Sequence, residues 1–122
     1  MQKLLIAVDS PKITDILERS LEGKFTIYTC NRGDEALQLL ESIRPDVLII
    51  NLALPHVTGL SVLQRTRYTP PAVLAFTYYI SNMVIQEATA AGVGGLLLLP
   101  CSLPYILSRL RRLLHGQENP SS

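Results

Sequence analysis

Short apolar runs and longer apolar stripes of helical spacing follow one another five times along this chain. The runs are rich in apolar residues and end in polar or turn-forming residues, which is typical of strands within a sheet. They predict strands over residues 3–8, 25–30, 46–51, 72–76 and 96–99. In the stripes, apolar residues recur every three or four positions, as on one face of a helix. They predict helices over residues 11–22, 36–43, 60–67, 82–91 and 103–114.

Residues at the predicted helix ends support these boundaries. Ser10, Ser102 and either Ser81 or Asn82 are suitable N-caps, and Pro11 suits a first helical turn. The first helix is predicted to bury a stripe of Ile13, Ile16, Leu17 and Leu21. The last helix is predicted to bury Leu103, Ile106, Leu107, Leu110 and Leu114.

Five strand–helix units in alternation predict a parallel α/β sheet with helices on both faces and right-handed crossovers. The alternation alone does not fix the order of the strands. A length of 122 residues suits one domain. We expect that domain to span residues 1–116, with the polar residues 117–122 forming a flexible tail or the start of a linker.

Composition and charge narrow the function classes. Hydrophobic residues make up 48% of the chain, which is enough for a core, and the net charge of +1 gives no electrostatic case for contact with nucleic acid. No apolar run is long enough for a membrane span, and the N-terminus does not resemble a signal peptide, so we expect a cytoplasmic protein without membrane contact. Cys30 and Cys101 make no disulfide framework. His56 and His115 stand apart, and we expect neither metal nor cofactor.

The most informative stretch runs from Asp46 to Gly59. Asp46 is followed by four apolar residues and then by the polar Asn51, with Pro55 four positions later and Gly59 a further four. This spacing resembles that of the response-regulator receiver domain, and the likeness extends over about residues 3–115.

The resemblance implies a flavodoxin-like (βα)5 three-layer sandwich with strand order 2-1-3-4-5. That order would place Cys30 and Cys101 at opposite edges of the sheet, which argues against a disulfide between them. Leu99–Pro100 matches a Lys-Pro pair of the family whose peptide bond is commonly cis, and we expect a cis bond here.

Receiver domains carry out phosphotransfer with five residues at the carboxyl edge of the sheet. The resemblance implies two acids for Mg²⁺ after the first strand, an aspartate phosphoacceptor after the third, a Ser or Thr after the fourth and a Lys after the fifth. The residues at these positions are Asp9, Ser10, Asn51, Thr77 and Leu99. Only Asp9 and Thr77 match. Because a carboxamide does not form an acyl phosphate as a carboxylate does, we predict a degenerate receiver that is not an enzyme.

The three departures are consistent with one another. A lysine at position 99 would lie among fewer acids, and leucine avoids a poorly compensated buried charge. Three other interpretations stay open. Asp9, Asn51, Thr77 and His56 could form an acid–base pocket, the Gly94-Gly95 turn could bind an anion, or Ser10 or Thr77 could serve as a non-standard phosphoacceptor.

A receiver domain without phosphotransfer still has surfaces for binding. The resemblance implies that the usual partner or dimer surface is formed by the fourth helix, the fifth strand and the fifth helix. Met83 and Ile85 cannot both face the core if Val84 does, and Tyr105, Arg109 and Arg112 are predicted on an outward stripe of the last helix. Arg109 has the spacing of an arginine that forms a dimer salt bridge in transcription factors of the family, but the matching acids are absent here. We therefore expect a homodimer or a complex with another signalling protein, with the domain serving as the regulatory domain of a transcriptional regulator.

Overall fold

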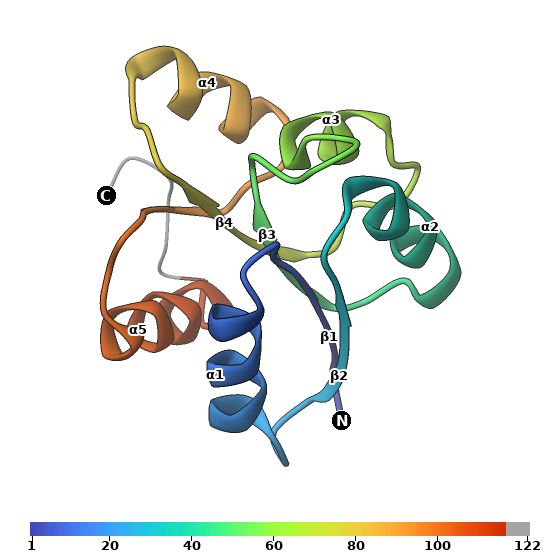
Figure 1. Ribbon diagram of the computed structural model, residues 1–122, viewed down its shortest axis with the longest axis vertical. Coiled ribbons are helices and arrows are strands. Elements are labelled where there is room, and N and C mark those ends of the chain that lie inside the picture. The colour runs from blue at the N-terminus through green and yellow to red at the C-terminus, as the bar shows by residue number, and fades with distance from the viewer. Residues whose placement is uncertain (117–122) are drawn as a thin grey trace.

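The computed structural model describes residues 1–116, which form ten alternating elements (Figure 1). The strands are β1 (Lys3–Ala7), β2 (Thr26–Cys30), β3 (Val47–Asn51), β4 (Ala72–Thr77) and β5 (Gly95–Leu98). The helices are α1 (Pro11–Leu21), α2 (Gly33–Ile43), α3 (Gly59–Arg65), α4 (Asn82–Ala90) and α5 (Leu103–Leu114). The tail or linker predicted over residues 117–122 lies outside the described residues.

All five strands are parallel and lie in the order β2-β1-β3-β4-β5. Helices α1 and α5 cover one face of the sheet, and α2, α3 and α4 cover the other (Figure 1). The predicted three-layer α/β sandwich and its strand order are confirmed. Cys30 ends one edge strand and Cys101 follows the other, and both are free thiols, as the strand order implied.

Side-chain alternation along the central strands builds a separate core on each face. In β3, Leu48 and Ile50 pack toward α2, α3 and α4, whereas Val47 and Ile49 pack toward α1 and α5. Every residue of β3 and β4 is buried. The continuous apolar runs in the sequence reflect this two-sided burial.

Serine caps fix three of the helix starts as predicted. The hydroxyls of Ser10, Ser81 and Ser102 each accept a hydrogen bond from the backbone N–H three residues later. The start predicted for the helix over residues 36–43 is wrong, because α2 already begins at Gly33. A side chain at position 33 would overlap the carbonyl group of Val57, so glycine lets α2 start against the loop after β3.

Two residues of the predicted helical stripes are exposed to solvent. Ile16 is 37% exposed and Leu114 is 36% exposed, and both lie at the margins of stripes whose central residues Leu17 and Leu110 are buried. Helix α3 ends at Arg65 rather than Arg67, since Thr66 adopts an extended backbone conformation. The Leu99–Pro100 peptide bond is cis, as expected.

Candidate functional site

Strand pairing gathers the predicted site positions at the carboxyl edge of the sheet. Asn51 at the end of β3 is paired with Phe76 of β4, and the next residue, Leu52, donates its N–H to the Phe76 carbonyl at 2.8 Å. Thr77 follows Phe76, and its carbonyl accepts the N–H of Leu99 at 2.8 Å. Three of the five positions are therefore linked through neighbouring backbone hydrogen bonds.

The remaining two positions follow β1, which pairs with β3 in the sheet. Asp9 is exposed to solvent. The Ser10 hydroxyl accepts a hydrogen bond from the N–H of Ile13 at 3.3 Å and so caps α1. Position 10 thus supplies a helix cap where the family resemblance implies a metal-binding acid.

Asn51 is enclosed by the loop that follows it. Its side chain is 1% exposed, and its Oδ1 has no hydrogen-bond partner among residues 1–116. The N–H of Gly59 donates to the Leu52 carbonyl at 2.9 Å, and a side chain at position 59 would overlap the Asn51 carbonyl. The Asn51–Gly59 spacing found in the sequence therefore reflects a close approach between the end of β3 and the start of α3.

Thr77 and Leu99 have contrasting surroundings. The Thr77 hydroxyl donates to the Tyr79 carbonyl at 2.9 Å and accepts from the Tyr79 N–H at 3.3 Å, so it closes the turn after β4. Leu99 is 5% exposed and packs in the apolar cluster beneath α1 and α5. Neither side chain supplies a charge at this edge.

Two of the other interpretations involve His56 and the Gly94-Gly95 turn. His56 is exposed on the loop after β3, in a left-handed backbone conformation with φ of 71°. The N–H of Gly94 donates to the Val73 carbonyl at 2.9 Å and is thus engaged in the sheet rather than free for an anion. Within residues 1–116, no group of three or more His, Cys, Asp or Glu side chains is placed to hold a metal ion.

The fold agrees with comparisons to known proteins. The family model described as the response regulator receiver domain matches residues 4–111. The chain belongs to the response regulator receiver domain family. The transcriptional regulatory protein TrcR of Mycobacterium tuberculosis is 30% identical over 123 residues, which cover 96% of this chain and 47% of TrcR. The response regulator MprA of Mycobacterium ulcerans is 32% identical over 92% of this chain and 50% of MprA.

A solved receiver domain has the same architecture. The chemotaxis protein CheY4 of Vibrio cholerae superimposes with a TM-score of 0.81 at 29% identity, covering 93% of this receiver domain and 98% of CheY4. This receiver domain spans about half the length of the curated relatives it matches. None of the helices in its described part is long and apolar enough to cross a membrane.

The predicted interaction surface exposes large apolar side chains together with the charged Arg112. Strand β5 lies at the sheet edge, with α4 before it and α5 after it on opposite faces. Met83 is 68% exposed, Leu98 48% and Tyr105 46%. Ile85 is instead half-buried and packs against the core. The prediction that Met83 and Ile85 do not both face the core is therefore confirmed, and Met83 is the exposed one. We call Met83, Leu98, Tyr105 and the exposed Arg112 the α4–β5–α5 surface.

Arg109 does not lie on this surface, and its predicted outward position is wrong. It is 3% exposed, because it lies three residues after the buried Ile106 and therefore at the margin of the buried stripe. Its Nη1 donates to the Tyr105 hydroxyl at 2.7 Å, and its guanidinium carbon lies 5.6 Å from the centre of the Tyr105 ring. The buried Arg109 thus holds the exposed Tyr105 in position.

Sequence reasoning missed an exposed apolar loop beside this surface. Tyr78 is 59% exposed, Tyr79 68% and Ile80 40%, and all three lie between β4 and α4. The available signal was a run of three large apolar side chains directly after the strand-ending Thr77, without a polar residue before Ser81. The exposed apolar surface therefore continues along this loop, from the carboxyl edge of the sheet to α4 and Met83.

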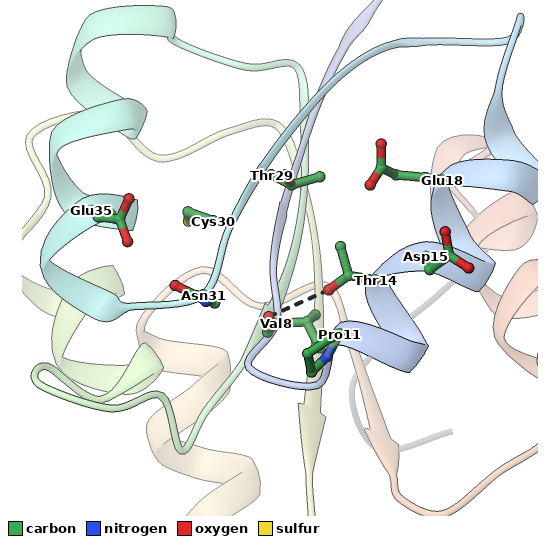
Figure 2. A pocket seen from close by; sticks show the side chains of 9 residues that line it. All are labelled: Val8, Pro11, Thr14, Asp15, Glu18, Thr29, Cys30, Asn31 and Glu35. Atoms are coloured by element: carbon green, nitrogen blue, oxygen red, sulfur yellow. Dashed lines mark hydrogen bonds between the residues drawn. The ribbon is translucent and has the colours of Figure 1, made fainter.

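A polar pocket of about 380 Å³ lies between α1 and the end of β2 (Figure 2), and the residues that line it do not include Asn51. Asp15 and Glu18 line it from α1, and Glu35 lines it from α2 on the opposite side. Burial, reinforced by the negative charge of Glu35, raises the pKa of the Cys30 thiol in this pocket to about 11. Cys30 is therefore a protonated, unreactive thiol at neutral pH.

Proposed function

We propose that this receiver domain works without phosphorylation, as an association module of a signalling protein. It binds a second copy of itself or another signalling protein through the α4–β5–α5 surface. The name of TrcR describes a transcriptional regulatory protein, and the similarity to TrcR supports a regulatory role in gene expression. The chain matches about half of TrcR. Residues 1–116 form the associating unit of this proposal.

The state of Asn51 carries the proposal. A buried carboxamide stands where the family resemblance implies the phosphoacceptor carboxylate, and its side chain is 1% exposed. Phosphoryl transfer needs a nucleophilic carboxylate, a divalent cation and fixed positive charge. Ser10 caps a helix and Leu99 packs in an apolar core. Position 10 therefore supplies no second acid, and position 99 supplies no cation.

The exposed side chains of α4, β5 and α5 support association. Met and Tyr are enriched in protein interfaces, and the solvent exposure of Met83, Leu98 and Tyr105 is costly unless a partner covers them. Tyr105 is held in place by Arg109, so it would lose little freedom on binding.

Incubation of the 122-residue chain with Mg²⁺ and a small phosphodonor tests the first half of the proposal. Intact-mass spectrometry should show no stoichiometric gain of a phosphoryl group. A gain of one phosphoryl group would overturn the proposal and support Ser10 or Thr77 as a non-standard acceptor. Substituting Ser10→Ala and Thr77→Val would then identify which hydroxyl is modified.

Light scattering over a concentration series tests the second half. We expect a dimer that is indifferent to Mg²⁺ and phosphodonor, and that Met83→Asp weakens at least about ten-fold, because a symmetric interface contains the new charge twice. Ile16→Asp is the matched control, since Ile16 is an exposed apolar residue of α1. A chain that dimerises only with phosphodonor would contradict the proposal, as would equal weakening by both variants.

A further inference from the structure

A second cavity opens between α1 and α5 at the carboxyl edge of the sheet. Its volume is about 380 Å³, which lies in the range of small-molecule sites, roughly 300–1,000 Å³. It is lined by the first half of each helix, by Tyr78 after β4 and by the Leu99–Cys101 segment after β5. It is thus separate from both Asn51 and the pocket of Figure 2.

The cavity has an apolar floor and an open rim. Leu17 is fully buried, and Leu99 and Ile106 are each 5% exposed, so the floor lies well below the surface. On the rim, Ile16 is 37% exposed and Tyr78 is 59% exposed. This depth distinguishes the cavity from a flat helix face, and its apolar walls would gain by covering an apolar ligand.

The charge around the cavity is one-sided. Among the described residues that line the cavity, Lys12 is the one that is charged, and the acids Asp15 and Glu18 lie on the other flank of α1. The first turns of α1 and α5 contain no acidic residue. Burial raises the pKa of the Cys101 thiol, although the positive charge of Arg109 opposes that rise, so an anion is disfavoured against the buried wall. At the open rim, the Lys12 ammonium group favours an anionic group.

We infer that this cavity binds a small amphipathic carboxylate, with the alkyl or aryl body on Leu17, Leu99 and Ile106 and the carboxylate beside the Lys12 ammonium group. Leu99 is central to the site because its side chain forms part of the apolar floor on which the body of the ligand packs. A lysine at this position would interrupt that floor with a charged group. The site does not include the α4–β5–α5 surface. If the cavity does not bind such a ligand, the proposed function is unaffected.

Titration of the 122-residue chain with decanoate, below the concentration at which micelles form, tests the site. Methyl NMR should show saturable shifts at Ile13, Leu17, Leu99 and Ile106. Lys12→Gln should weaken decanoate about two- to five-fold, the usual strength of an exposed ion pair, without changing the binding of 1-decanol. Ile16→Asp, which adds a carboxylate at the rim, should weaken decanoate at least about ten-fold.

Two control variants separate this site from general surface binding. Arg19→Gln removes an exposed cation from the other flank of α1, and Met83→Asp alters the α4–β5–α5 surface. Both should bind decanoate as the parent chain does. The inference is overturned if no methyl shift saturates, if Lys12→Gln and Arg19→Gln weaken decanoate equally, or if the shifts spread over α4 and survive Ile16→Asp.

Discussion

Replacing Asn51 by aspartate should destabilise this receiver domain in a way that depends on pH. The substitution is nearly isosteric, so packing at the end of β3 is kept and only the ionisable group is new. The position is 1% exposed, and the Asn51 Oδ1 has no hydrogen-bond partner in the described chain. Ionisation of the introduced carboxyl would therefore remove its hydration without providing donors in return.

The size of the effect follows from the expected pKa of the introduced carboxyl. Burial raises the pKa of a carboxyl group by up to about 3–5 units, and we take a shift of about 2 units from an unfolded value of about 3.9. Well below pH 4 the group is protonated in both states and the substitution costs little. As pH rises toward about 6, the unfolded chain loses its proton first, and the free energy of unfolding falls by about 2.7 kcal/mol.

Urea denaturation followed by circular dichroism at pH 4.5 and pH 7.5 measures this loss. With an m-value of about 2 kcal/mol/M, the midpoint of Asn51→Asp should fall by roughly 1 M more than that of the parent chain between these two pH values. Asn31→Asp is the matched control, because Asn31 is exposed and should show no comparable change. Equal pH dependence in parent and Asn51→Asp would refute the reasoning, and so would strong stabilisation by Mg²⁺ or efficient phosphorylation of this single variant.

The thiols and glycines give further predictions. Iodoacetamide at pH 8 should modify Cys101 well before Cys30, whose pKa of about 11 leaves only about one thiolate in a thousand; peptide mapping measures the order, and the Cys30 rate should rise with pH toward 11. Gly59→Ala should cost about 1–3 kcal/mol in thermal denaturation, because the new methyl group meets the Asn51 carbonyl. Gly94→Ala is its control and should cost less, since the flexible Leu113 side chain can move aside.

The sequence was sufficient for the architecture because two-sided burial leaves a strong pattern. The runs over 47–50 and 72–76 are apolar throughout, since both faces of β3 and β4 are covered by helices. Serine caps then located the starts of α1, α4 and α5. The strand order came from the family resemblance, because a pattern of alternating elements does not specify which strands are neighbours.

Side-chain burial at helix margins was beyond the sequence pattern. Arg109 was expected on an outward stripe of the last helix with Tyr105 and Arg112, yet it is 3% exposed and its side chain bonds to the Tyr105 hydroxyl. The start of α2 at Gly33 depends on contact with Val57, which is distant in sequence. The cavity between α1 and α5 was missed for the same reason, since it needs segments from four parts of the chain.

The edge positions show how this fold persists when side-chain chemistry changes. Asn51, Thr77 and Leu99 hold their places through backbone contacts: the Asn51 carbonyl lies against Gly59, and the Thr77 carbonyl accepts the Leu99 N–H. None of these contacts requires a carboxylate or an ammonium group. Strand register and burial therefore maintain the edge geometry, while the side chains are free to exchange charge for packing. At Leu99 that exchange also supplies the apolar floor of the α1–α5 cavity, which a lysine would not.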